Sequence, residues 1–336
     1  MTSHFPALPA ELRLARLRPP TGRVPVVIDT DTANEIDDQF ALAWAALAPE
    51  RIDLQAVLAE PFSFAHRRAA LGRDLKDQAP FNAPGEGMER SHAEARRILA
   101  LLPGTARIPV LRGSTDYLAA ADRPQPSEAA RHLVARGMAQ PDDTPLVVLA
   151  LGCVSNIASA LLMEPRLVQR LLVVWTSGWP SHAPHVNVSL NLEQDLHATR
   201  VLLDSGVPLV YLPGFHVGAQ LRLSLPEVER WVKGQGAIGD ALHHLFTHNP
   251  LWELQGIDSF FAHSWVMWDL ICVAWLLNPD WVPSTLVPTP RLGTDLRWRH
   301  DAQRVPMREG HGVRRDAIFA DFLSRLARAA GGVPQA

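Results

Sequence analysis

Short apolar runs alternate along the chain with longer segments whose apolar residues recur at helical spacing. The longer segments predict helices, and the short runs predict strands, each several residues long. Strands alternating with helices form βαβ units around a parallel sheet. Strand runs such as LVVLAL at 146–151 and LLVVW at 171–175 are apolar nearly throughout, which is typical of a sheet covered on both faces. We therefore predict an α/β fold with an open, mostly parallel sheet and helices on both faces. The predicted strands are 24–28, 52–58, 108–111, 146–151, 171–176 and 208–211, and the predicted helices are 37–47, 89–101, 128–138, 157–163, 196–203 and 316–329.

No internal repeat, low-complexity tract or linker divides the 336 residues. We predict a single domain over 1–336, with a less regular, cap-like stretch at about 214–300. The proline- and glycine-containing stretch 81–91 (FNAPGEGMERS) predicts a loop that leads into a helix.

The formal net charge of −3 gives no indication of a nucleic-acid or membrane-surface partner. The first twenty residues lack the apolar core of a signal peptide, and no apolar run reaches membrane-span length without polar interruptions. The two cysteines, Cys153 and Cys272, lie in apolar surroundings without a CxxC partner, which favours buried thiols in a reducing compartment. We expect a soluble, cytoplasmic protein.

Four aspartates, Asp29, Asp31, Asp37 and Asp38, follow within ten residues after the first predicted strand. Like charges about 4 Å apart repel by roughly 4 kcal/mol at an effective dielectric of 20. The dipole of the following helix offsets at most about 1 kcal/mol per group. A hard divalent cation with oxygen ligands, Ca²⁺ or Mg²⁺, stabilises such a cluster. The alternative is a helix N-terminus with solvated acids.

A second acidic residue stands in an unusual place. The stretch 265–277 contains one polar side chain, Asp269, and predicts a helix buried on nearly all sides. A buried carboxylate must be neutralised, paired or metal-bound. We therefore expect Asp269 to be a further ligand of the same ion, with its carboxyl within about 5 Å of that of Asp38. The alternative is an Asp hydrogen-bonded to a helix N-terminus or to an arginine.

Several motifs together resemble those of the inosine-uridine-preferring nucleoside hydrolase family. DTDTANEIDD at 29–38 resembles its DxDxxxDD signature, with two extra residues before the final pair. ALGCVSNIA at 150–158 is similar to its ATGPLTNIA element, and NLEQD at 191–195 to part of its EFNxxxDPxAA helix. Trp268-Asp269 occupies the place of a late His-Asp pair. The segments GMERS (87–91) and RDAIFADFL (315–323) also resemble elements of a bacterial branch.

The resemblance implies a Rossmann-like fold, assembly as a homodimer or homotetramer, and hydrolysis of a small-molecule nucleoside with bound Ca²⁺; Mg²⁺ is the less favoured ion. Asp31 would be the catalytic base and a metal ligand. The other implied metal ligands are Asp38, the backbone carbonyl of Leu151, and Asp269. Asp29 would be a supporting acid. The implied substrate-binding residues are Asp37, Asn191, Asp269, Trp268, Asn34 and Glu35.

The sequence departs from the family pattern at three places. Ser189 replaces a glutamate, which alters a contact to the 5′ end of the ribose. The stretch 56–62 (AVLAEPF) replaces a Gly-Asn, and the inserted Asn34 and Glu35 offer a substitute contact. Trp268 replaces the leaving-group histidine; it either stacks on a purine or packs in the core. The possible histidine substitutes are His182, His185, His216 and His263.

Two other functions compete with this interpretation. The stretch 26–32 (VVIDTDT) fits the aspartyl-phosphate motif of haloacid-dehalogenase-like phosphatases, with Asp29 as nucleophile and Asp31 as acid/base. That class needs a lysine near its phosphate, and neither Lys76 nor Lys233 clearly follows a strand. The other possibility, motivated by Ser189 and Trp268, is a calcium-dependent binder of a ribosylated ligand without turnover.

Overall fold

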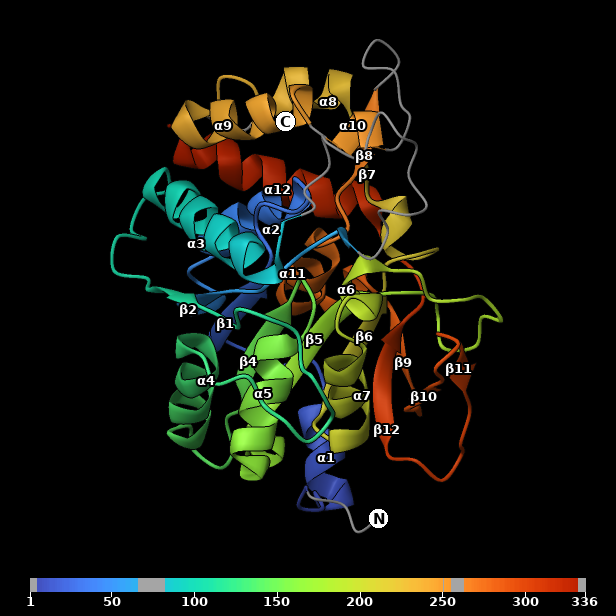
Figure 1. Cartoon of the computed structure of the whole chain (residues 1–336). Helices are drawn as coiled ribbons and strands as arrows, with labels where there is room; N and C mark the ends of the chain where they lie inside the picture. The colour runs from blue at the N-terminus through green and yellow to red at the C-terminus, as the bar shows by residue number, and fades with distance from the viewer. Residues whose placement is uncertain (1–4, 66–81, 250, 255–262, 332–336) are drawn as a thin grey trace.

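The computed structural model describes residues 5–65, 82–249, 251–254 and 263–331. Within these residues the central feature is an eight-stranded sheet in the order β3-β2-β1-β4-β5-β6-β12-β9 (Figure 1). Neighbouring strands are parallel except for β12 and β9, which are antiparallel. The predicted α/β class and mostly parallel sheet are confirmed. The strands are β1 (Val24–Thr30), β2 (Ile52–Ala59), β3 (Val110–Arg112), β4 (Leu146–Ala150), β5 (Leu171–Ser177), β6 (Leu209–Pro213), β9 (Ser284–Pro288) and β12 (Pro306–Gly310).

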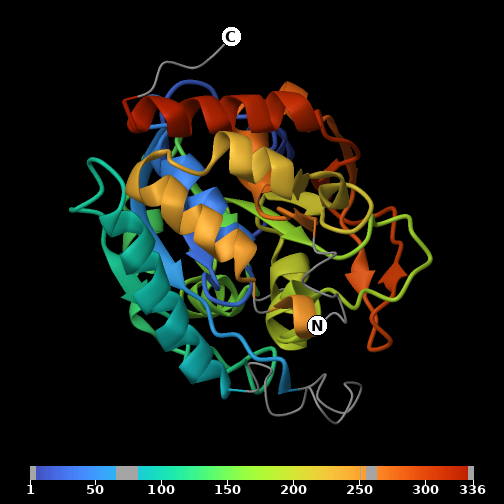
Figure 2. The same cartoon turned by 90° about the horizontal axis from the view of Figure 1, so that it is seen from above.

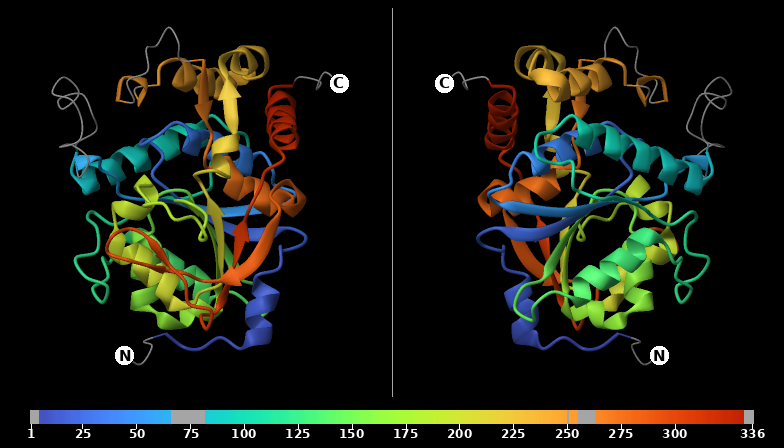
Figure 3. Two further views of the ribbon diagram at one scale, coloured as in Figure 1. Left: turned by 90° about the vertical axis from the view of Figure 1, so that its right-hand side faces the viewer. Right: turned by 90° about the vertical axis from the view of Figure 1, so that its left-hand side faces the viewer.

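Helices cover both faces of this sheet (Figures 1 and 3). Residues of β1 show why: Val26 and Ile28 join one buried apolar cluster, whereas Val27 joins a second cluster on the opposite face. The first cluster contains side chains of α2 (Asp37–Ala46), α3 (Pro84–Ala100), α9 (Gly236–Thr247), α11 (Leu270–Leu277) and α12 (Arg315–Ala329), of which α9 packs on α2. The second face carries α4 (Glu128–Met138), α5 (Ser155–Met163) and α7 (Leu196–Ser205). A strand with apolar side chains on both faces requires such a three-layer arrangement.

The remaining elements are short. They are the helices α1 (Ala10–Arg16), α6 (Leu190–Glu193), α8 (Leu225–Trp231) and α10 (Leu251–Leu254), the strands β7 (Arg222–Ser224), β8 (Ser264–Val266), β10 (Arg291–Leu292) and β11 (Trp298–Arg299), and the 3₁₀ helices Pro165–Gln169, Gly218–Gln220 and Pro279–Trp281. Seen from above, α9 and α12 extend across the same end of the molecule (Figure 2). No helix in the described part of the chain is both long and apolar enough to cross a membrane.

The strand order reverses at β1, because successive strands are added on one side of β1 first and on its other side afterwards. From β1 the chain continues to β2 and β3 on one side, and then crosses to β4, β5 and β6 on the other. Ligands of open α/β sheets bind beyond the carboxyl ends of the strands at such a reversal. Asp31 directly follows β1 and Leu151 directly follows β4, so both stand at this position.

Two predicted elements were wrong. Most of the expected loop at 81–91 is helical, because α3 begins at Pro84, with proline in the first turn and the Glu86 carboxylate accepting the Ala83 N–H at 3.0 Å; Phe81 lies outside the described residues. The expected single helix at 265–277 is a strand followed by a helix. β8 pairs antiparallel with β7, and α11 begins only at Leu270. A short apolar run does not distinguish a buried strand from a buried helix.

The stretch 214–300 is more regular than expected. Its described part contains α8, α9, α10 and α11 as well as β7, β8 and β9. Of these, α9 and α11 contribute side chains to the same apolar cluster as α2. That this chain forms a single domain stays a prediction.

Candidate functional site

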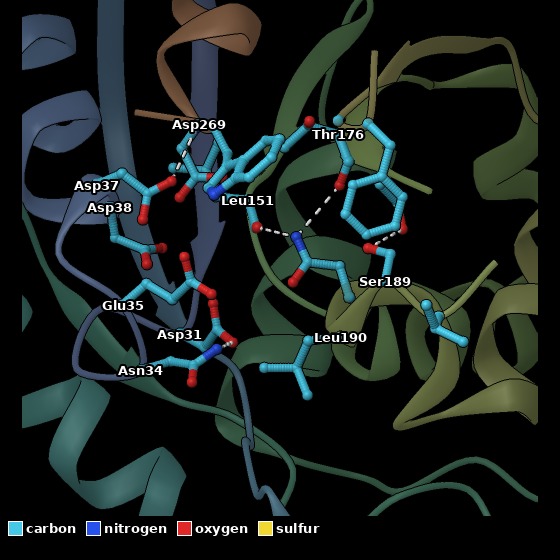
Figure 4. A pocket seen from close by; sticks show the side chains of 16 residues that line it. Asp31, Asn34, Glu35, Asp37, Asp38, Leu151, Thr176, Ser189, Leu190 and Asp269 are labelled. Atoms are coloured by element: carbon cyan, nitrogen blue, oxygen red, sulfur yellow. Dashed lines mark hydrogen bonds between the residues drawn. The ribbon is translucent and has the colours of Figure 1, made fainter. Parts of the chain in front are cut away.

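A pocket opens at the carboxyl ends of β1, β4, β5 and β6 (Figure 4). Its described lining contains five carboxylates and no lysine, arginine or histidine. The pocket therefore has an acidic side and a neutral side. Its lining residues are Asp31, Asn34, Glu35, Asp37, Asp38, Leu151, Thr176, Ser177, Val188, Ser189, Leu190, Asn191, Gly214, Phe215, Trp268 and Asp269.

A tight turn after β1 places Asp31 in the pocket. The Ala33 and Asn34 N–H groups donate to the Asp31 carbonyl at 2.6 and 2.8 Å, which reverses the chain before α2. The Asn34 side-chain amide also donates to Oδ2 of Asp31 at 2.8 Å. The other oxygen faces Gly152, where a Cβ atom would lie 2.8 Å from Oδ1 of Asp31. A side chain at position 152 would therefore displace the carboxylate, which explains the glycine.

Three buried carboxylates converge from two distant segments. Asp37 and Asp38 stand on the first turn of α2, and Asp269 immediately precedes α11, which packs against α2. Each offers an oxygen, and the three oxygens lie within 4.8 Å of one another. The structure thus brings Asp38 and Asp269 together as expected. It also brings in Asp37, which we expected to contact the sugar, whereas Asp31 lies in the same pocket outside this trio.

This crowding changes the acidity of the carboxyls. Burial raises the pKa of Asp38 to about 6, although hydrogen bonds from Thr30 and with Asp269 oppose that shift. Burial, followed by repulsion from Asp37 and Asp38, raises the pKa of Asp269 well above its usual value. Burial also raises the pKa of Asp31 and Asp37, with further repulsion from Asp38 and Glu35 respectively. Ionising all of them together is unfavourable unless a positive charge is bound among them.

A neutral wall faces the carboxylates. On α6, Asn191 donates its side-chain N–H groups to the backbone carbonyls of Leu151 and Thr176, the latter at 3.2 Å (Figure 4). Because both contacts require a donor, they fix the orientation of the amide and leave its oxygen as the acceptor for a ligand. The Leu151 carbonyl retains a second lone pair. It can therefore accept from Asn191 and still bind a cation.

Trp268 is a wall of the pocket and is only partly buried. Its ring meets Phe215 edge-on, with centroids 5.9 Å apart and an interplanar angle of 85°. Behind Phe215, Trp179 lies 5.2 Å away and contacts the His185 ring at 4.2 Å. None of the four candidate substitute histidines is among the described residues that line the pocket. The aromatic pair, rather than an imidazole, is what this wall presents.

A second acidic pair lies beneath the pocket. Asp29 is fully buried and accepts a hydrogen bond from the Asn156 side chain at 3.0 Å, and the Asn156 backbone N–H donates to Glu60 at 3.0 Å. Burial raises the pKa of Asp29 to about 6 and that of Glu60 well above its usual value. An Asp29 sealed from solvent cannot attack a phosphate, which argues against the phosphatase alternative. Sequence reasoning missed Glu60, although its signal, a carboxylate directly after a buried strand, is the one that identified Asp29.

Comparisons with known proteins identify a family and several relatives. The family model for inosine-uridine preferring nucleoside hydrolase matches residues 86–319. The chain is 26% identical over 162 residues to the putative pyrimidine-specific ribonucleoside hydrolase RihB of Shigella boydii serotype 4 (strain Sb227), covering 47% of this chain and 64% of that protein. The same identity holds for RihB of Escherichia coli (strain K12 / DH10B), where 49% of the relative is covered. The chain thus spans about half to two thirds of the length of these curated relatives.

Solved structures show the same fold. The purine-preferring ribonucleoside hydrolase from Gardnerella vaginalis superposes with a TM-score of 0.68 at 19% identity, covering 91% of this chain and 99% of that one. The type III effector protein XopQ complexed with adenosine diphosphate ribose superposes with a TM-score of 0.60 at 16% identity, covering 95% and 97%. The family match begins after the acidic motif at 29–38, so the roles of those residues rest on the geometry of the pocket.

Proposed function

Because the chain belongs to the inosine-uridine preferring nucleoside hydrolase family, we propose that it hydrolyses the N-glycosidic bond of a ribonucleoside, releasing the free base and ribose. The observation that carries this proposal is the convergence of Asp37, Asp38 and Asp269 beside Asp31, at the reversal point of the sheet. The neutral wall with Asn191 and the aromatic pair complete a pocket with acidic, polar and apolar sides.

We propose Ca²⁺ as the cofactor, in preference to Mg²⁺. Asp38, Asp269, Asp31 and the Leu151 carbonyl would hold it, and Asp37 adds a further oxygen to the same group. The donor set fits because every candidate ligand is an oxygen, which hard divalent cations prefer. A bound cation of this kind lowers the pKa of a coordinated water.

In the proposed mechanism Asp31 accepts the proton of the attacking water. The Asn34 amide holds Oδ2 of Asp31, so Oδ1 is the oxygen that takes the proton. As the base leaves, positive charge develops on the sugar, and the surrounding carboxylates stabilise it. Asp29 lies beneath, where it accepts a hydrogen bond from the Asn156 side chain, and we assign it a supporting role.

The lining also suggests how the substrate is held. We assign Asp37, Asp269, Asn191, Asn34 and Glu35 to hydrogen bonds with the sugar hydroxyls, because all five line the pocket. Trp268, together with Phe215, would stack against the base. The described lining of the pocket contains no cationic side chain to hold a phosphate group, so the proposal is for a nucleoside rather than a nucleotide.

The test is an assay of sugar and base release. With calcium, we expect hydrolysis of at least one common ribonucleoside or of p-nitrophenyl riboside, whose leaving group needs no protonation. A chelator should abolish this activity, and calcium should restore it. The matching 5′-monophosphate should be cleaved at least about 100-fold less efficiently, because the described lining offers its phosphate five carboxylates and no cationic side chain. Calcium-dependent ribose binding without any turnover would instead support the non-catalytic binder.

Calcium affinity is expected to fall as the pH is lowered through about 6, the pKa of buried Asp38. Below that value a proton occupies the oxygen that the ion needs, so each displaced proton costs up to about tenfold in affinity per pH unit. Isothermal titration calorimetry at pH 5, 6 and 7.5 measures the calcium affinity and the number of protons released on binding at each pH. An affinity independent of pH over this range would contradict the assignment.

Assembly into a homodimer or homotetramer stays a prediction, which sedimentation analysis would test.

A further inference from the structure

Beneath the pocket, one glutamate side chain connects the ends of two strands. Glu60 directly follows β2 and is fully buried. Its Oε1 accepts the Asn156 backbone N–H at 3.0 Å, and its Oε2 accepts the Cys153 thiol at 3.3 Å. Both donors belong to the turn that leads from β4 into α5. The Glu60 side chain therefore ties the end of β2 to the turn that follows β4.

The same contacts reach the end of β1. The Glu60 backbone N–H donates to the Thr30 carbonyl at 2.8 Å, and the Glu60 carboxyl shares a hydrogen bond with that of Asp29. In turn, Asp29 accepts the Asn156 side-chain amide at 3.0 Å and, with its backbone carbonyl, the Leu151 N–H at 2.8 Å. The ends of β1, β2 and β4 are thus held together beneath the pocket.

The end of β3 packs against the same cluster. The Asn156 side-chain oxygen accepts the Ser114 N–H at 2.8 Å, and the side-chain amide donates to the Ala59 carbonyl at 3.2 Å. A Cβ atom at Gly113 would overlap this carbonyl oxygen, so only glycine fits there. Glu60 is therefore part of a closely packed polar layer that joins the ends of four strands.

Two groups that we assign to the reaction stand directly above this layer. Asp31 follows β1, and its Oδ1 faces Gly152, where a Cβ atom would lie 2.8 Å away. Gly152 lies between Leu151, whose carbonyl we assign to the cation, and Cys153, whose thiol the glutamate below accepts. A shift of the turn after β4 relative to β1 would change the separation between the Leu151 carbonyl and the Asp31 carboxylate. The Glu60 carboxyl resists this shift because it bonds to both sides.

We propose that Glu60 is a positioning residue, whose side chain holds the Asp31 carboxylate at the distance from the Leu151 carbonyl that the reaction needs. This inference rests on the proposed nucleoside hydrolysis. Glu60 has no exposed surface and is not among the residues that line the pocket, so it acts through Asp31 rather than on the substrate.

The experiment compares Glu60→Ala with Glu60→Gln, using p-nitrophenyl riboside and calcium. Alanine removes all side-chain contacts, so kcat should fall about 10- to 100-fold, whereas KM should stay within about threefold because Asn191 and Trp268 are unchanged. Glutamine keeps an acceptor for the Asn156 N–H and a donor toward Asp29, so this variant should retain at least about one third of kcat. An unchanged kcat in Glu60→Ala, or a Glu60→Gln variant that is equally slow, would overturn the proposal.

Glu309→Ala is the matched control. Glu309 is also a buried glutamate, and it accepts the Ser181 N–H at 2.7 Å, but it stands on β12, outside the described lining of the pocket. Its removal should leave kcat within about twofold of the wild-type value. A loss of kcat as large as that of Glu60→Ala would overturn the proposal, because it would show a general effect of deleting a buried carboxylate.

Hydrogen–deuterium exchange tests the positioning independently of activity. The Leu151 and Asn34 amides donate to the carbonyls of Asp29 and Asp31, and the substitution at position 60 removes neither acceptor. Glu60→Ala should nevertheless speed their exchange at least about tenfold, whereas Glu60→Gln and Glu309→Ala should change it by less than about threefold. A wild-type protein that cleaves no nucleoside would refute the proposed function. Unchanged exchange of both amides in Glu60→Ala would refute the positioning role.

Discussion

Replacing Asp31 by alanine is expected to abolish hydrolysis, lowering kcat/KM by at least about a thousandfold. The variant loses the group that accepts the proton of the attacking water, and an oxygen that we assign to the cation. Sequence reasoning predicts that hydrolysis and calcium binding disappear together. The convergence of Asp37, Asp38 and Asp269 supplies three other oxygens, so calorimetry of the variant reports how much of the binding depends on Asp31.

Asp31→Asn keeps the shape of the side chain and should be nearly as inactive. The matched control is Asp53→Ala on β2, which removes an aspartate paired with Arg23 at the surface and should leave activity unchanged. Full nucleosidase activity in either Asp31 variant would show that the catalytic base has been misassigned.

Asp269→Asn is expected to have opposite effects on function and on stability. The amide binds a cation poorly, so hydrolysis should be lost and calcium should no longer raise the melting temperature. In the wild-type protein, calcium at about 100 times its dissociation constant adds roughly 2.7 kcal/mol of stability, or about 4 °C for a chain of this size.

Without calcium, the same variant should melt about 2–5 °C higher than the wild-type protein at pH 8. Burial and the neighbouring carboxylates raise the pKa of Asp269 in the folded state. A raised pKa contributes stability below the unfolded value, about 3.9, and that contribution is lost as the pH rises through the folded value. Removing the charge removes this loss, so the gain should shrink toward pH 4.

Differential scanning calorimetry with and without calcium measures both effects. Asp280→Asn is the matched control, because Asp280 is exposed and lies shortly after the end of α11. An Asp269→Asn protein that still gains stability from calcium, or that is less stable than the wild-type protein at pH 8 without calcium, would contradict the shared ion site.

Much of the fold follows from apolar periodicity. β1, β4 and β5 read directly as buried strands, because their side chains are apolar on both faces. The pattern did not distinguish β8 from the start of α11, because pairing with β7 is a long-range contact that leaves no local signal. It also missed β9 and β12. The side chains of β9 are mostly half-buried or exposed, and β12 mixes buried with half-buried residues, so neither is uniformly apolar.

The sequence predicts those parts of the candidate site in which charged side chains stand in apolar, buried segments. Asp269 alone in an apolar stretch, and four aspartates after a buried strand, are unfavourable unless something compensates, and that argument led to the pocket. Gly152 gave no such signal, because a glycine after a strand is ordinary. Its role depends on the close approach of the Asp31 carboxylate, which only three-dimensional coordinates show. Glu60 should have been noticed by the argument applied to Asp29.

The contact between Asp37 and the Asp269 backbone joins residues 232 positions apart. During synthesis on the ribosome, the acidic turn after β1 therefore emerges long before the helix that completes the proposed ion site. Until α11 packs against α2, those carboxylates are expected to remain hydrated and to bind a cation only weakly. The proposed site would thus be among the last parts of the molecule to assemble, and tight cation binding would report that most of the chain has folded.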